Sequence, residues 1–241
     1  MSGDMMNRAG VCCRARITKD EAIRYISHLD YASLMQRAIR RAKLPAAYSE
    51  GFNPHMKMSF ASALSVGVTS DAEYMDVELS ETLPETEIAK RLRSALPDGV
   101  RLLNLRVLDG KPKALMALTD EAVYEVTAPL RGSIDDARGA LAGFNAAAEC
   151  SYLRRTPKKT REIEVRQYMV GDVRGEETTD GRIKLTMAIR ITPGGSVKPQ
   201  EILTLLCEKF AFPVEAQAAS VCRRALLSRG KALLPEAEVK P

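Results

Sequence analysis

The chain contains two histidines, His28 and His55, and both lie in one polar segment, residues 25–60. A histidine exchanges a proton near neutral pH, so it can act as a general acid or base. Cations beside it could stabilise negative charge on a reacting group. These residue types predict a functional site in this segment, with His28 and His55 as the candidate catalytic residues.

Polar side chains around the two histidines could bind an anion. They lie on the outer faces of an expected helix and on the long loop that follows it. The predicted binding residues of this segment are Arg24, His28, Asp30, Arg37, Arg41, Tyr48, Glu50, Asn53, His55 and Lys57. In the structural alternative, Ser27 and Asp30 only cap the helix, while Arg37, Arg40 and Arg41 only solvate its outer face.

The loop that follows the helix, residues 43–56, has 14 residues. An extended chain covers about 3.3 Å per residue and a helix rises about 1.5 Å, so the loop is long enough to return along the helix. We therefore expect its polar groups to approach His28 and Arg24 and to form one anion-receptive pocket at the helix N-terminus. The alternative is a loop that stays at the helix C-terminus and leaves the histidines far apart.

A second group of cations lies between Tyr152 and Tyr168. Thr156 and Pro157 interrupt it, which is typical of a hairpin turn. Such a basic tip could follow the phosphate backbone of an RNA. Its predicted contact residues are Arg154, Arg155, Lys158 and Lys159. The alternative is a solvated turn between two strands.

The five cysteines predict neither a metal site nor a cofactor. None forms a C-x-x-C pair, and no C-x-x-x-C-x-x-C motif for an iron–sulfur cluster is present. Phosphate-binding and dinucleotide-binding glycine motifs are absent, and two histidines without a spaced third ligand argue against zinc. We expect reduced thiols in a cytoplasmic protein, because no apolar run is long enough for a signal peptide or a membrane span.

The composition predicts a protein with a packed core, and its charge is compatible with a polyanionic partner. Hydrophobic residues make up 45% of the chain and charged residues 28%, so a core is expected and disorder is not. The net charge of +5 is compatible with RNA but is also common in proteins without such a partner. Aromatic residues amount to only 5%, so any base-stacking surface must be small.

Periodicity predicts the elements that must position these residues. In the first half, the expected order is strand, helix, strand, strand, helix, strand, which is the ferredoxin-like split βαβ pattern. The expected ranges are 11–18, 29–42, 57–61, 72–79, 84–96 and 100–108. Both helices then cover one face of an antiparallel sheet. The residues expected on the other, free face are Arg14, Arg16, Tyr74, Asp76, Glu78 and Arg106.

The second half predicts a similar, less regular copy. Strands are expected at 121–128, 150–155, 161–170, 182–191 and 215–226, with helices at 134–148 and 199–210. The predicted fold class is α+β, with two tandem ferredoxin-like (split βαβ) domains and antiparallel sheets. The predicted boundaries are a disordered tail at 1–10, a domain at 11–108, a linker at 109–119, a domain at 120–228 and a tail at 229–241.

Two strings in the N-terminal half resemble a known bacterial family. They are SHLDYASLMQRAIRRAKLPAAYSEGFNPH and KMSFASALSVGVTSDAEYMDVEL. They are similar to the radical-SAM-associated, or radical-SAM-linked, proteins, a domain family of unknown function. The likeness extends from about Cys13 to Leu206. One departure is Met56, where many relatives have a proline after the histidine, so the loop around His55 is expected to be less rigid here.

The resemblance implies a partner and no established reaction. Members accompany a radical-SAM protein and often stand beside genes of ribosome and RNA metabolism. Three functions follow as expectations. The first is an accessory protein that presents RNA or a ribosome-related substrate to a radical-SAM enzyme. The second is a metal-independent RNA-processing enzyme that uses His28 and His55. The third is an adaptor whose free sheet face docks the enzyme without nucleic acid.

Overall fold

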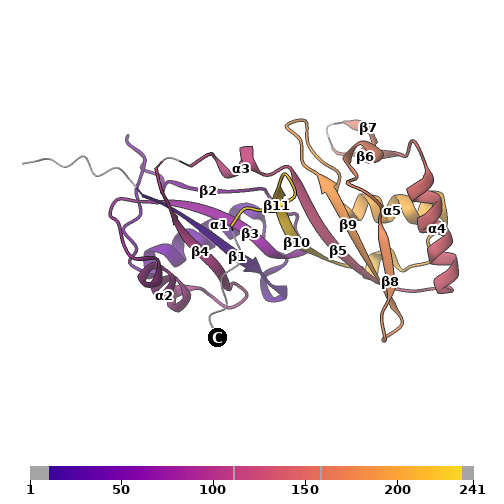
Figure 1. Cartoon of the computed structure of the whole chain (residues 1–241), viewed down its shortest axis with the longest axis horizontal. Coiled ribbons are helices and arrows are strands. Elements are labelled where there is room, and N and C mark those ends of the chain that lie inside the picture. Colours follow the sequence, from indigo (N-terminus) through magenta and orange to yellow (C-terminus); the bar gives the residue numbers. More distant parts are fainter. Residues whose placement is uncertain (1–10, 111, 158, 235–241) are drawn as a thin grey trace, which may run out of the picture. The chain divides into compact units, whose positions relative to one another are not determined.

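Strands and helices alternate along the chain in a mixed α+β fold whose sheet is mostly antiparallel (Figure 1). The computed structural model describes residues 11–110, 112–157 and 159–234. The chain divides into two compact units, an N-terminal unit that ends at Thr119 and also takes in the chain from Ala232, and a C-terminal unit from Asp120 to Lys231. The predicted tail at 1–10 and residues 235–241 lie outside the described residues.

The N-terminal unit contains the elements that carry both histidines. They are β1 (Val11–Lys19), the 3-10 turn η1 (Glu21–Ile23), α1 (His28–Arg41), β2 (Met58–Phe60), β3 (Val68–Leu79), α2 (Glu85–Ala95), β4 (Leu102–Leu108) and α3 (Leu115–Leu118). The strand order is β4-β1-β3, and β2 pairs with β3. All of these pairs are antiparallel.

The core of this unit lies between the sheet and the helices α1 and α2. Alternate residues of β1, among them Ala15 and Ile17, join Met35 of α1 and Leu92 of α2 in one buried cluster. The opposite residues of β1 point away from this cluster, and Arg14 lies across from Asp76 of β3. The predicted alternation of faces is therefore confirmed for β1 and β3.

The face predicted to be free is largely covered, which corrects the expectation from the sequence. Arg14, Tyr74 and Asp76 are buried on it, with exposed fractions of 5%, 2% and 8%. The segment predicted as a linker packs here: α3 lies against β2 and β3, and the Arg14 Nη2 donates to the carbonyl of Lys113 at 3.4 Å. Leu115 of this segment is apolar and buried, which favours packing of α3 against the sheet, whereas Glu78 on the same face stays exposed and Arg16 and Arg106 are half-buried.

Local signals fix the start and end of α1. The Ser27 hydroxyl oxygen accepts a hydrogen bond from the backbone N–H of Asp30 at 3.2 Å, as the spacing predicts. The helix begins at His28, one residue earlier than expected. It ends at Arg41, where Lys43 adopts a left-handed φ of 51° and Pro45 prevents continuation.

The C-terminal unit also combines strands with helices, and it contains a separate hairpin. Its elements are β5 (Glu121–Pro129), α4 (Ile134–Ala146), β6 (Ser151–Arg155), β7 (Thr160–Glu164), η2 (Arg166–Tyr168), β8 (Arg174–Glu177), β9 (Arg182–Arg190), α5 (Pro199–Phe210), η3 (Ala216–Ala218) and β10 (Ser220–Ser228). The strand order is β10-β5-β9-β8, and β6 and β7 form a separate two-stranded sheet. The predicted cap of α4 by Ser133 and Asp136 is confirmed as a capping box.

Several strand and helix boundaries in this unit differ from the expected ones. The strand expected at 161–170 ends at Glu164 and is followed by a 3-10 turn, and the last strand begins at Ser220, not at Glu215. Strand β8 was not expected, because its sequence RGEE is polar and contains a glycine. The chain also remains structured beyond 228, since β11 (Lys231–Ala232) and the buried Leu234 follow.

Candidate functional site

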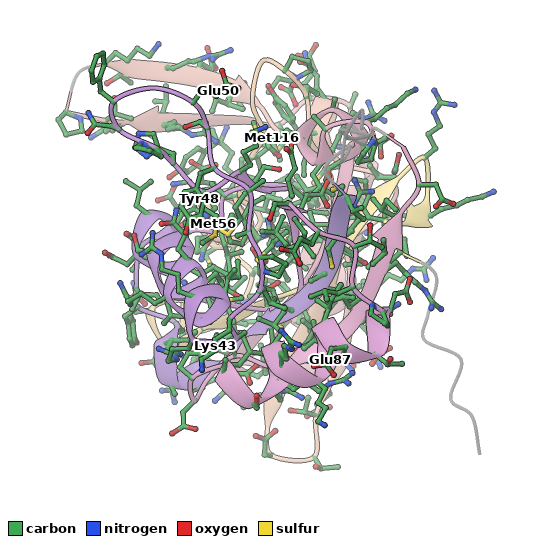
Figure 2. All side chains as sticks on the ribbon, turned by 90° about the vertical axis from the view of Figure 1, so that its left-hand side faces the viewer. Lys43, Tyr48, Glu50, Met56, Glu87 and Met116 are labelled. Atoms are coloured by element: carbon green, nitrogen blue, oxygen red, sulfur yellow. The ribbon has the colours of Figure 1, made fainter. Side chains whose placement is uncertain are left out.

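The loop after α1 folds into a hairpin. Tyr48 and Met56 face each other in an antiparallel bridge, and the N–H of Ser49 donates to the carbonyl of His55 at 2.8 Å. The N–H of His55 in turn donates to the Ser49 hydroxyl at 2.9 Å. Figure 2 shows Glu50 on the far side of Tyr48 and Met56 from Lys43. Residues 49–55 therefore form an outward tip, here called the 49–55 tip.

The base of this hairpin is anchored to the sheet. Ala46 bridges Leu79 of β3, and Met56 is buried with 6% of its surface exposed. The N–H of Lys57 donates to the carbonyl of Ala47 at 2.9 Å. The two legs are thus held by each other and by β3, which fixes the direction in which the tip projects.

His28 contacts Phe60, and His55 contacts Ser49. His28 stands at the start of α1 with its ring edge-on to Phe60, and the ring centroids are 5.3 Å apart. His55 lies on the exposed 49–55 tip beside Ser49. The loop leaves α1 as a hairpin instead of extending along the helix, because its legs satisfy each other's backbone groups. A pocket shared by both histidines stays a prediction.

Phe52 is the most exposed apolar residue of this region, and the sequence reasoning did not select it. Its exposed fraction is 106%, so solvent surrounds the ring on the 49–55 tip. Gly51 before it has a φ of 113°, which a residue with a side chain rarely adopts. The signal was present in the sequence: an aromatic residue between Gly51 and Asn53-Pro54 lies in a turn, where a core cannot cover it.

The cationic side chains of α1 and the Lys57 side chain after the 49–55 tip make different contacts. Arg37 and Arg40 are exposed on α1, and the Arg40 Nε lies 3.5 Å from the Tyr48 hydroxyl. Lys57 pairs with Glu78 at 3.2 Å. Arg41 instead donates to the carbonyl of Ala95 at 2.6 Å and so ties the ends of α1 and α2 together. This contact gives Arg41 a structural role that differs from both interpretations of the sequence, ligand binding and solvation of the outer face.

The remaining predicted residues of the segment differ in exposure. Asp30 is exposed and serves the cap of α1 with Ser27. Glu50 and Asn53 are exposed on the 49–55 tip. Arg24 lies before α1 in the chain.

Exposed apolar side chains and a cation lie near the N-terminal end of α1. Tyr25 and Leu29 are 68% and 77% exposed, and Val66 is 55% exposed. The N–H of Gly67 donates to the carbonyl of Arg24 at 2.9 Å, which brings the 65–67 loop beside Tyr25. The Arg24 guanidinium lies over the Tyr25 ring at 4.5 Å from its centroid. Aromatic and cationic groups are therefore presented together here as well.

The basic hairpin of the C-terminal unit differs from the expected set of RNA contacts. Arg154 forms two hydrogen bonds with Glu201, both 2.6 Å long, and donates to the carbonyl of Ser196 at 2.8 Å. The carboxylate of Glu201 is the main cause that raises the pKa of Arg154. Arg154 is thus engaged within the chain, and its assignment as a phosphate contact is corrected. Arg155 and Lys159 are exposed, and Lys158 lies outside the described residues.

Cys12 and Cys13 are buried in the sheet of the N-terminal unit. Burial raises the pKa of Cys12 to about 11 and that of Cys13 to about 12, so both thiols are protonated at neutral pH. Among the described residues, none of the five cysteines forms a disulfide. In the described ranges, no three side chains of His, Cys, Asp or Glu are grouped to hold a metal ion.

Among the helices of the described residues, none combines the length and the apolar character that crossing a membrane requires.

These features define a mixed α+β protein with exposed aromatic and cationic groups around α1. Residues 13–199 match a family described as an uncharacterized protein conserved in bacteria (DUF2344). Because the match covers most of the chain, the protein belongs to that family. None of the curated proteins matches the chain.

One solved structure shows a distant likeness. It is entitled "Crystal Structure of a Cbf5-Nop10-Gar1 Complex", and it has 10% sequence identity and a TM-score of 0.46. The match covers 83% of this chain and 46% of that chain, so this chain spans less than half the length of the protein it matches. We draw no functional conclusion from a likeness of this size.

Proposed function

We propose that this protein is an RNA-binding accessory protein that acts beside a radical-SAM enzyme, and that the 49–55 tip and the adjoining face of α1 contact the RNA. The observation that carries the proposal is the fully exposed ring of Phe52. It projects from a hairpin whose Tyr48 hydroxyl lies 3.5 Å from Arg40 of α1. An aromatic platform and a cation are therefore on neighbouring elements.

The chemistry of single-stranded RNA matches these two groups. Unstacked bases lie on aromatic side chains, and each such contact contributes about 1–3 kcal/mol. Exposed arginines bind the phosphates between the bases. Phe52 would take a base, while Arg37 and Arg40 would take phosphates, with Asn53 and His55 available for base edges. A ring that stays in water has no stabilising role in the fold, which favours a role in binding.

The strand order supports the finer fold proposal of two tandem ferredoxin-like domains, at 11–108 and 120–228. The order β4-β1-β3-β2 in the first unit corresponds, element for element, to β10-β5-β9-β8 in the second. In each unit one helix follows the first strand and another precedes the last. The β6–β7 hairpin is then an insertion after the first helix of the second domain.

The radical-SAM partner and the cytoplasmic location rest on the sequence. The strings around Tyr25 to Leu79 resemble the radical-SAM-linked proteins, and the chain has no cluster motif of its own. A separate enzyme would therefore supply the radical chemistry. The five free cysteines suit a reducing compartment.

The two alternative functions have less support. An RNA-processing enzyme would need His28 and His55 to act on one substrate, and the contacts of His28 with Phe60 and of His55 with Ser49 give no support for a shared site. An adaptor that docks through the expected free sheet face would need Arg14, Tyr74 and Asp76, and these side chains are buried.

Replacement of Phe52 tests the RNA proposal. The probe is a fluorescent oligouridine, and fluorescence anisotropy gives the dissociation constant. Phe52→Ala should weaken binding about tenfold, within the 1–3 kcal/mol that a base stack contributes, and Phe52→Tyr should retain it. The matched control is Met116→Ala, which removes an exposed apolar side chain outside the proposed RNA surface. Equal affinities of Phe52→Ala and the unaltered protein would refute the proposed RNA surface.

A further inference from the structure

Strand β4 is the last strand at one end of the strand order β4-β1-β3. Within the described residues, no strand pairs with the outer edge of β4. Such an edge normally presents unpaired N–H and C=O groups that can add a strand from another chain. The sequence of β4, LLNLRVL, is mostly apolar and contains no proline. The strand sequence alone therefore gives this edge little protection against strand addition.

Two outward N–H groups of β4 are already bonded to side chains. The N–H of Val107 donates to Glu85 Oε1 at 2.9 Å, and the N–H of Leu105 donates to Asn104 Oδ1 at 2.7 Å. Leu105 and Val107 are two residues apart in the regular part of the antiparallel ladder with β1. The backbone groups of such alternate residues point to the same edge, here the edge away from β1.

The Glu85 carboxylate is held in this position by two elements. Glu85 is the first residue of α2, which packs beside β4 (Figure 1). The helix is anchored in the core through Ile88 and Leu92, which are 1% and 2% exposed. From the strand, the Arg106 Nη1 donates to Glu85 Oε2 at 3.0 Å. One carboxylate therefore binds a backbone donor and a side-chain donor of β4 at the same time.

This arrangement opposes the addition of a strand at β4. An incoming strand needs the N–H groups of Leu105 and Val107 as donors for its own carbonyl groups. It would have to displace the Glu85 carboxylate, whose hydrogen bonds are charge-assisted and therefore stronger than those of a neutral acceptor. The Glu85 side chain is also 35% exposed, so it stands at the surface that the incoming strand must approach.

We propose that Glu85 and Asn104 form an edge lock, which closes the outer edge of β4 against strand addition and keeps two copies of this chain apart. Without the lock, the β4 strands of two copies pair antiparallel. A second copy fits the opened edge because a two-fold axis brings the same apolar strand to both sides of the contact. The edge lock involves none of the residues of the proposed RNA surface and does not depend on the proposed function.

Hydrogen exchange of the backbone amides, followed by NMR on the dilute full chain, measures the lock directly. The amide of Val107 should exchange slowly in the unaltered protein, although no described strand covers it. Glu85→Ala should speed this exchange about tenfold, because the acceptor is lost. Glu85→Gln keeps an acceptor and should retain most of the protection. The amide of Arg106 points to β1, so its exchange should stay unchanged.

Sedimentation velocity at increasing protein concentration measures the second part of the proposal. Glu85→Ala with Asn104→Ala should associate to dimers at concentrations where the unaltered chain shows no such increase in sedimentation coefficient. The matched control is Glu87→Ala, which removes a carboxylate of the same helix turn that pairs with Arg91. It should sediment as the unaltered chain does.

A third substitution distinguishes edge pairing from misfolding. Val107→Pro, added to the double variant, removes an outward N–H without breaking the ladder with β1, so the dimers should disappear. Association caused by a loosened α2 would persist in that triple variant.

Four results would overturn the edge lock. They are unchanged exchange of Val107 in Glu85→Ala, a double variant that does not associate, dimers that persist after Val107→Pro, and equal association of Glu87→Ala.

Discussion

Arg154 and Arg155 are neighbours in β6, yet only one of them is available to a ligand. Arg154 is directed at α5 and bonded to Glu201, whereas Arg155 is exposed. The sequence predicts that this segment is a basic hairpin, and this is what forms. It could not predict the pairing of Arg154, because Glu201 lies 47 residues further along the chain. Contacts at such separation depend on how whole elements pack.

Around α1 too, residue type and spacing identify only some of the residues that the structure exposes. Tyr48, Glu50, Asn53 and His55 were selected for their polar groups, and they lie on or beside the exposed tip. Phe52 was passed over because an aromatic residue is more often buried than exposed. Arg41 was selected for its charge, but its packing against the end of α2 could not be seen from the chain.

A buried ion pair gives a prediction at the scale of single residues. Arg14 and Asp76 form two hydrogen bonds, 2.8 and 2.9 Å long, and their side chains are 6% and 11% exposed. Arg14→Met would leave Asp76 buried without its partner, so we expect a loss of about 3–5 kcal/mol in unfolding free energy, measured with urea. The double variant Arg14→Met with Asp76→Leu should recover most of the loss.

The exposed pair between Arg101 and Asp20 is the matched control for Arg14→Met. The Arg101 side chain is 62% exposed, so Arg101→Met should cost less than about 1 kcal/mol. A similar loss for both variants would contradict a special role of the Arg14–Asp76 pair.

Elements with strong periodicity were predictable, and short ones were not. The strands β1 and β3 and the helices α1 and α2 show apolar residues at the spacing of their structure, and they form where expected. The helix α3 has only four residues and follows Lys-Pro-Lys, so its sequence is typical of a linker. The apolar side chain of Leu115 in α3 can be buried only after the sheet has formed.

Covering of the sheet by α3 can be tested by comparing two adjacent residues. Leu115 is 1% exposed and Met116 is 75% exposed. Leu115→Ala should lower the free energy of unfolding by about 2–4 kcal/mol, because it leaves a cavity above the sheet. Met116→Ala should change it by less than about 0.5 kcal/mol. Small and equal changes in the unfolding free energy of the two variants would show that this segment is only a linker.

At the scale of the whole molecule, exposed cations occur in both units. The N-terminal unit presents Arg37 and Arg40 on α1, and the Arg40 Nε lies 3.5 Å from the hydroxyl of Tyr48 in the hairpin that carries Phe52. The C-terminal unit presents Arg155 and Lys159 on the β6–β7 hairpin. The net charge of +5 alone could not have located these two groups.

The salt dependence of RNA binding distinguishes the two cationic surfaces. Each phosphate contact to single-stranded nucleic acid contributes about 0.7 to the slope of log affinity against log salt. Arg37→Ser with Arg40→Ser should therefore lower the slope for oligouridine by about 1.4 if each arginine neutralises one phosphate. Arg155→Ser with Lys159→Ser should leave it unchanged. A slope that falls only in the second variant would place the RNA on the hairpin.

The most direct measurement for the central claim is photochemical crosslinking of the full protein to oligouridine, with the attached peptide identified by mass spectrometry. Crosslinking needs a base in contact with a side chain, and the exposed ring of Phe52 offers the best stacking surface. We predict that the crosslinked peptide contains residues 48–57 and that the signal is lost in Phe52→Ala. Crosslinks confined to other peptides, or the same yield from Phe52→Ala, would contradict the account.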